Sequence, residues 1–192
     1  MKTTFLALFL VFAFASAKAD FVVDTEGNPV RNGGSYYILP ALWGHGGGVG
    51  LAATGNESCP LTVVQKSSEL SNGLPTRLAS PYRIAYLPTN FIMEFTVVAP
   101  PKCADTPAKW TIVRGEDETK EVKLLGYENT LRGWFKIQTS TVRGIYKMVF
   151  CPTDEDSCGA VGISKDGKGH RRLVIDDDAP FHVVFRGAES SA

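Results

Sequence analysis

Short segments rich in β-branched and aromatic residues recur along almost the whole chain, and each is closed by Gly, Pro, Asn or Asp. None of them keeps the 3.6-residue hydrophobic period of a helix, so the pattern predicts strands throughout. The predicted strands are Ser35–Leu39, Leu61–Gln65, Tyr82–Leu87, Phe91–Val98, Trp110–Val113, Val122–Leu125, Trp134–Thr139, Tyr146–Phe150, Val161–Ser164, Arg171–Ile175 and Phe181–Phe185. About eleven or twelve short strands fit an all-β barrel or sandwich, and spacing alone does not choose between the two.

The first residues have the features of a secretory leader. Lys2 supplies the positive start, Phe5–Phe14 is an apolar run, and small residues up to Ala19 form a cleavage site. The apolar run is too short to span a bilayer. We therefore expect residues 1–19 to be removed and residues 20–192 to form one domain. The expected destination is the cell exterior, with a vacuole as the alternative.

The charge balance gives little reason to expect a nucleic acid or an anionic membrane as a partner. The 192-residue chain has 20 basic and 20 acidic residues, and removal of the leader takes away Lys2 and Lys18 but no acid, which leaves a net charge of −2. We also expect no cofactor and a monomeric protein.

Four cysteines, Cys59, Cys103, Cys151 and Cys158, in a secreted chain predict two disulfides, for which spacing alone allows three connectivities. No C-x-x-C string is present, which argues against a zinc ribbon or a thioredoxin-like site. Asn56-Glu57-Ser58 is an acceptor sequence for N-glycosylation at Asn56.

The sequence contains no set of residues that predicts catalysis. Gly44–Gly48 includes an H-G-G-G string used for oxyanion holes, but the G-x-S-x-G elbow that accompanies it in esterases is absent, so we interpret this stretch as a flexible loop. His45, His170 and His182 lie far apart in the sequence, and Asp176–Asp178 lacks the spacing of a calcium loop. We expect neither an enzyme nor a metal site.

The stretch Ser80-Pro81-Tyr82-Arg83-Ile84-Ala85 points instead to a binding role. It presents one permanently charged arginine just after a proline that restricts the backbone, which is the form of a substrate for a trypsin-like protease. The same stretch is also compatible with an ordinary strand that carries an exposed arginine.

Several separate strings, in the same order, resemble the plant Kunitz (soybean trypsin inhibitor) family. The segment Val22–Ile38 matches every position of the N-terminal signature of that family. Further matches are Thr54–Gln65, Ser80–Ile84, Gly133–Phe135, Tyr146–Pro152 and Gly169–Val174, so the resemblance covers essentially the whole mature chain. The stretch Phe91–Lys102 and the glycine-rich loop depart from the family pattern.

The resemblance implies a β-trefoil of twelve strands with the disulfides Cys59–Cys103 and Cys151–Cys158. It also implies that the loop between the fourth and fifth strands carries the reactive bond, which falls between Arg83 and Ile84, and that Asn32 braces this loop from inside. The implied function is substrate-like, competitive inhibition of a trypsin-like serine endopeptidase. Two alternatives are a non-inhibitory storage or defence protein of the same fold and an inhibitor of subtilisin or α-amylase that uses another surface.

Overall fold

The computed structural model describes residues 20–59, 61–115, 118–154 and 157–188, so the predicted leader lies outside the described residues. In these ranges the chain forms thirteen strands and no helix long and apolar enough to cross a bilayer. The strands are β1 (Gly34–Pro40), β2 (Val49–Ala52), β3 (Thr62–Gln65), β4 (Thr76–Ala79), β5 (Ile92–Val97), β6 (Trp110–Arg114), β7 (Lys120–Leu124), β8 (Thr130–Leu131), β9 (Gly133–Thr139), β10 (Tyr146–Pro152), β11 (Gly159–Lys165), β12 (Arg171–Ile175) and β13 (His182–Gly187).

Six of the strands close into a barrel. Antiparallel pairing runs from β13 to β1, β4, β5, β9 and β10, and β10 pairs with β13 again, which completes the ring. Closure leaves this ring without a free strand edge.

Three hairpins cover one end of the barrel. They are β2 with β3, β6 with β7, and β11 with β12. Strands β3, β7 and β12 also pair with one another, through Thr62 with Lys123, Arg172 with Val64, and Val174 with Glu121. One barrel strand, one hairpin and a second barrel strand therefore repeat three times along the chain, which is the β-trefoil that the resemblance implied.

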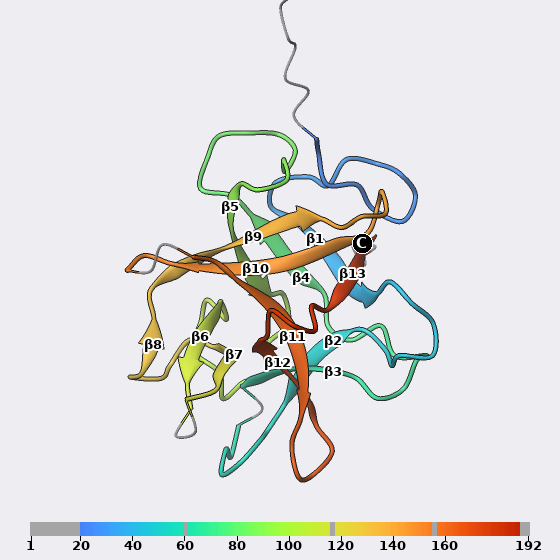
Figure 1. Ribbon diagram of the computed structural model, residues 1–192. Helices are drawn as coiled ribbons and strands as arrows, with labels where there is room; N and C mark the ends of the chain where they lie inside the picture. The colour runs from blue at the N-terminus through green and yellow to red at the C-terminus, as the bar shows by residue number, and fades with distance from the viewer. Residues whose placement is uncertain (1–19, 60, 116–117, 155–156, 189–192) are drawn as a thin grey trace, which may run out of the picture.

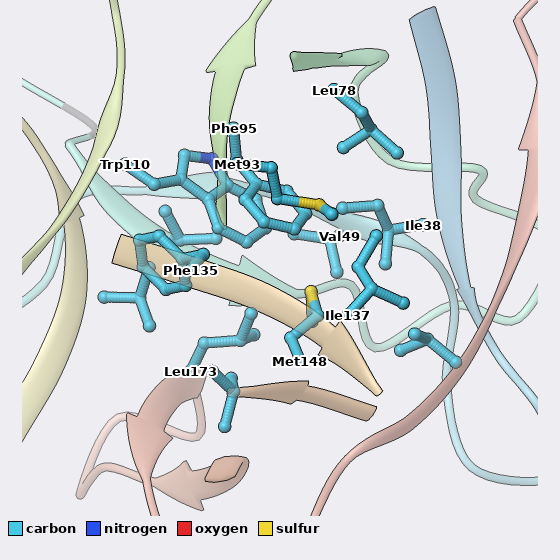
Figure 2. Close-up of a cluster of buried hydrophobic side chains, with 14 of the residues drawn as sticks. Ile38, Val49, Leu78, Met93, Phe95, Trp110, Phe135, Ile137, Met148 and Leu173 are labelled. Atoms are coloured by element: carbon cyan, nitrogen blue, oxygen red, sulfur yellow. The ribbon is translucent and has the colours of Figure 1, made fainter. Parts of the chain in front are cut away.

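Strand alternation places the core inside the barrel and under the hairpins. In β5, for example, Met93, Phe95 and Val97 are buried while the residues between them are partly exposed. Figure 2 shows Phe95, Trp110 and Phe135 packed together, and the rings of Phe95 and Trp110 are stacked with their centroids 4.9 Å apart. Contacts among side chains from different strands thus hold the three repeats together.

The strand predictions are largely correct, with one wrong segment and three omissions. Tyr82–Leu87 does not form a strand, because its backbone pairs only through an isolated bridge at Tyr86 and otherwise bonds within the segment, to the Asn32 side chain and to the N-terminal segment. The sequence did not predict β2, β4 and β8, which are short. The thirteenth strand, compared with the twelve implied, arises where Arg132 separates β8 from β9.

Gly47 and Gly48, in the segment we predicted to be a flexible loop, are buried and closely packed, whereas Gly44 and His45 are exposed. The N–H of Gly47 donates to the carbonyl of Lys66 at 2.7 Å, and the N–H of Gly48 donates to that of Ser71 at 2.8 Å. A Cβ atom at Gly48 would collide with the backbone oxygen of Asn72. Glycine is required here mainly because two backbones approach closely.

Candidate functional site

The segment 80–91, which contains Arg83, connects β4 to β5 and lies at the end of the barrel opposite the three hairpins, beside the N-terminal segment (Figure 1). Leu78, in β4, and Leu87, within the connection, are completely buried and lie on either side of the stretch that contains Arg83. The N–H of Leu87 donates to the carbonyl of Val30, and the carbonyl of Leu87 accepts from the N–H of Val22, both at 2.9 Å. The stretch between the two leucines is thus fixed at both of its ends.

A tight turn places Asn32 beneath this connection. The N–H of Gly34 donates to the carbonyl of Arg31 at 3.1 Å, and Gly33 has a φ of 80°, which the third position of such a turn requires. The backbone N–H of Asn32 then donates to the carbonyl of Ala85 at 2.9 Å. The turn is therefore attached to the loop through its backbone as well as through the Asn32 side chain.

The side-chain amide of Asn32 bridges both halves of the loop. Its Nδ2 donates to the carbonyls of Tyr82 and Ile84, each at 3.1 Å, and makes a longer contact of 3.4 Å with that of Ser80. Its Oδ1 accepts the backbone N–H of Ser80 at 2.8 Å, which fixes the orientation of the amide because a backbone N–H needs an acceptor. One side chain thus holds the backbone on both sides of the Arg83–Ile84 bond.

The side chain of Arg83 is exposed, and it makes no hydrogen bond or ion pair with any described residue. Its neighbours are held more firmly. Ile84 is partly buried against the core, and its N–H donates to the carbonyl of Tyr82 at 2.9 Å, so the backbone turns at Arg83. Ser80 is buried, whereas Pro81 and Ala85 are exposed. The structure therefore presents one guanidinium to solvent from a fixed backbone.

The four cysteines form Cys59–Cys103 and Cys151–Cys158, the pairing that the resemblance implied. Asn56 is exposed in a turn between β2 and β3, so its amide faces solvent; glycosylation there stays a prediction.

His170 and Asp176 have local structural partners, whereas the side chains of His45 and His182 are exposed. Nδ1 of His170 lies 2.8 Å from Oδ2 of Asp166 in the turn between β11 and β12. The carboxylate of Asp176 accepts the backbone N–H groups of Asp178 and Ala179. Among the described residues, no group of three or more His, Cys, Asp and Glu side chains is arranged to hold a metal ion.

Phe21 and Phe91 were not predicted to belong to the site. The ring of Phe21 packs edge-on against Tyr86, and that of Phe91 packs edge-on against Tyr82. Both phenylalanines lie outside the arginine motif, and only folding brings them beside it. Their sequence signal is weak, since Phe91 only begins a predicted strand and Phe21 lies in no predicted strand.

Comparisons with known proteins agree with this geometry. A family described as "Trypsin and protease inhibitor", of the Kunitz type, matches residues 22–186. The chain is 44% identical to trypsin inhibitor DE-3 of Erythrina variegata over 172 residues, which cover 88% of this chain and 99% of that one. It is 40% identical to the Kunitz-type trypsin inhibitor KTI1 of Glycine max over 205 residues, which cover 100% of this chain and 99% of that one.

A solved structure shows the same fold in a complex. Soybean trypsin inhibitor, crystallised with porcine pancreatic trypsin, superimposes with a TM-score of 0.82 at 40% identity and covers 88% of this chain and 100% of its own. Family, relatives and fold agree with the resemblance seen in the sequence. The chain belongs to the plant Kunitz family of trypsin and protease inhibitors and is not an enzyme.

Proposed function

We propose that this protein inhibits trypsin-like serine endopeptidases as a substrate-like competitive inhibitor, with Arg83 in the specificity pocket of the protease and Arg83–Ile84 as the reactive bond. The observation that supports it best is the pair of hydrogen bonds from the Asn32 amide to the carbonyls of Tyr82 and Ile84, which lie on either side of that bond. Tyr82 and Arg83 are exposed, so a brace on both sides of this bond is more than burial of the loop requires.

The arginine side chain supplies the recognition. A trypsin-like pocket ends in a buried carboxylate, with which a planar guanidinium pairs through two hydrogen bonds while the methylene stem contacts the apolar walls. Because the Arg83 side chain has no partner among the described residues, it enters such a pocket without breaking an internal contact. A neutral side chain would leave the buried carboxylate of the protease unpaired.

The brace supplies the resistance to cleavage. If the protease cuts Arg83–Ile84, the carbonyls of Tyr82 and Ile84 stay bonded to the same amide of Asn32, so the new amine remains beside the acyl group. Religation then competes with hydrolysis. The fixed backbone also reduces the conformational entropy that a flexible peptide would lose on binding.

The relatives favour this function over the alternatives drawn from the sequence. The relatives compared above are named trypsin inhibitors, and one was crystallised with trypsin. None of these names supports a storage role or inhibition of subtilisin or α-amylase. We also propose that the leader is removed and that the protein is secreted as a monomer, with the vacuole as the alternative destination.

Titration of active trypsin tests the proposal. We expect the wild-type protein to inhibit with one-to-one stoichiometry, and Arg83→Ala to weaken inhibition by roughly a hundredfold to a thousandfold or more. Arg132→Ala is the matched control, because Arg132 is also exposed but lies between β8 and β9. A wild-type protein that leaves trypsin active, or an Arg83→Ala variant that inhibits like the wild type, would overturn the proposal.

A further inference from the structure

Four exposed aromatic side chains surround the proposed reactive bond. Phe21, Tyr82, Tyr86 and Phe91 have relative exposures of 44%, 52%, 40% and 41%. Tyr82 directly precedes Arg83, and Tyr86 lies just beyond Ala85. A soluble protein seldom leaves several large aromatic side chains together at its surface unless they serve as a contact area.

The four rings form two pairs, which we name the flanking aromatic pairs. Phe91 and Tyr82 make an edge-on contact with ring centroids 6.0 Å apart, and Phe21 and Tyr86 make another at 6.2 Å. One pair contains the residue before Arg83, and the other contains a residue on the far side of the reactive bond. Each pair joins one residue of the stretch Ser80–Tyr86 to one from outside that stretch, so this stretch alone does not supply the surface.

The backbone holds the outer members of both pairs in place. The N–H of Thr89 donates to the carbonyl of Asp20 at 2.8 Å, and Phe21 forms an isolated antiparallel bridge with Pro88. Phe91 directly precedes β5, whose hydrogen bonds to β4 and β9 fix its start. The pairs are therefore preorganised, and their exposed faces lose little conformational freedom when they are covered.

We propose that the flanking aromatic pairs form a secondary binding surface for the protease, in contact with apolar side chains on both sides of its specificity pocket. This inference rests on the proposed function and names the part of the interface that surrounds Arg83. Aromatic side chains that are rigid, half-exposed and next to a charged anchor are typical of the residues that contribute most to a protein–protein interface. Together they would bury apolar area around the Arg83 ion pair and exclude water from it.

The pairs and the brace are expected to act on different kinetic steps. Loss of a ring removes short-range contacts that exist only in the complex, so it speeds dissociation and leaves association nearly unchanged. Neither Phe21 nor Phe91 bonds to Asn32, so Asn32 keeps its bonds to the loop when one of these rings is removed, and resistance to cleavage should persist.

The test measures association, dissociation and slow cleavage with trypsin for Phe21→Ala and Phe91→Ala, neither of which changes the stretch Ser80–Tyr86. We expect each variant to dissociate roughly tenfold faster or more, with association within about threefold of wild type and with wild-type resistance to cleavage. Trp43→Ala and Leu70→Ala are matched controls, because these side chains are 89% and 91% exposed and lie in the β1–β2 and β3–β4 connections. Both controls should dissociate like the wild type.

The outcomes separate this inference from the proposed function. If the wild type inhibits and Arg83→Ala does not, but Phe21→Ala and Phe91→Ala dissociate at the wild-type rate, the secondary surface is refuted and the reactive bond stands. If the wild type does not inhibit, both proposals fall. Thermal unfolding of each variant checks that it is folded. If an alanine variant is not folded, Phe21→Leu or Phe91→Leu replaces it, because leucine retains apolar bulk without the ring. A wild-type dissociation rate for that leucine variant overturns the inference.

Discussion

The Oδ1 atom of Asn32 accepts the backbone N–H of Ser80 at 2.8 Å, across 48 positions of sequence. This hydrogen bond fixes the amide so that its Nδ2 faces the carbonyls of Tyr82 and Ile84. A residue from the turn before β1 thereby determines the conformation of the connection between β4 and β5.

Replacement of Asn32 should convert the inhibitor toward a substrate. Asn32→Ala removes the bonds to Tyr82 and Ile84, and Asn32→Asp keeps the acceptor for Ser80 but sets a carboxylate against carbonyl oxygens. We expect trypsin to cleave both variants faster than wild type during long incubation, with rates compared by mass spectrometry. Asn28→Ala is the control, because the bonds of Asn28 in the described part of the chain are to Asp24 and Glu26 and not to the loop. Cleavage of both Asn32 variants at the wild-type rate would show that the brace is dispensable.

A change of the side chain at position 83 should change specificity without loosening the loop. Arg83 has no side-chain partner among the described residues, so Arg83→Phe leaves the Asn32 contacts intact. We expect trypsin inhibition to fall by roughly a hundredfold or more and inhibition of a chymotrypsin-like protease to rise. Inhibition constants against both proteases measure this. An unchanged preference for trypsin would mean that residue 83 does not occupy the specificity pocket.

The two disulfides should contribute unequally to stability. Cys59–Cys103 spans 44 positions and Cys151–Cys158 spans 7, so the first restricts the unfolded chain more. Chain-entropy arithmetic gives about 4 kcal/mol for the longer loop and about 2.5 kcal/mol for the shorter. Urea unfolding of the Cys59→Ala/Cys103→Ala and Cys151→Ala/Cys158→Ala variants compares the two losses. A larger loss from the shorter loop would contradict the entropic explanation.

Glu57 should make the protein less stable in acid. Burial alone would raise the pKa of Glu57, but hydrogen bonds from Lys123 at 2.7 Å and Tyr127 at 2.5 Å, with others from Thr54 and Thr62, outweigh it and hold that pKa below its usual 4.5. The folded state therefore binds fewer protons than the unfolded state. This stabilisation is present above pH 4.5 and is lost as the pH falls through the lowered pKa.

Unfolding free energies measured from neutral pH down to about pH 3 test this prediction. Glu57→Gln should be less stable than wild type by about 1–3 kcal/mol at neutral pH, because Lys123 and Tyr127 lose a charged acceptor. The difference from wild type should shrink as the pH falls. Glu128→Gln is the control, since Glu128 is exposed and next to Tyr127. A constant difference between Glu57→Gln and wild type at every pH would exclude the mechanism.

The strands were predictable where one face alternates between buried and exposed, as in β5 and β9. Strand β2 was missed because its Val-Gly-Leu-Ala sequence is short and contains glycine, and β8 has only two residues. Tyr82–Leu87 has the composition of a strand but not the pairing, because its hydrogen-bond partners come from Asn32 and the N-terminal segment. Composition indicates which secondary structure a residue favours, but it does not show which neighbour forms hydrogen bonds with its backbone.

An all-β chain with two disulfides and one arginine in a proline-restricted stretch was predictable from the sequence, because these features depend on local composition. The tertiary structure shows how Asn32, which the family resemblance implied as the brace, holds both sides of the Arg83–Ile84 bond, and it places Phe21 beside Tyr86. These contacts join segments far apart in the chain. They exist because closure of the barrel brings the N-terminal segment, the β4–β5 connection and the start of β5 to the same end of the molecule.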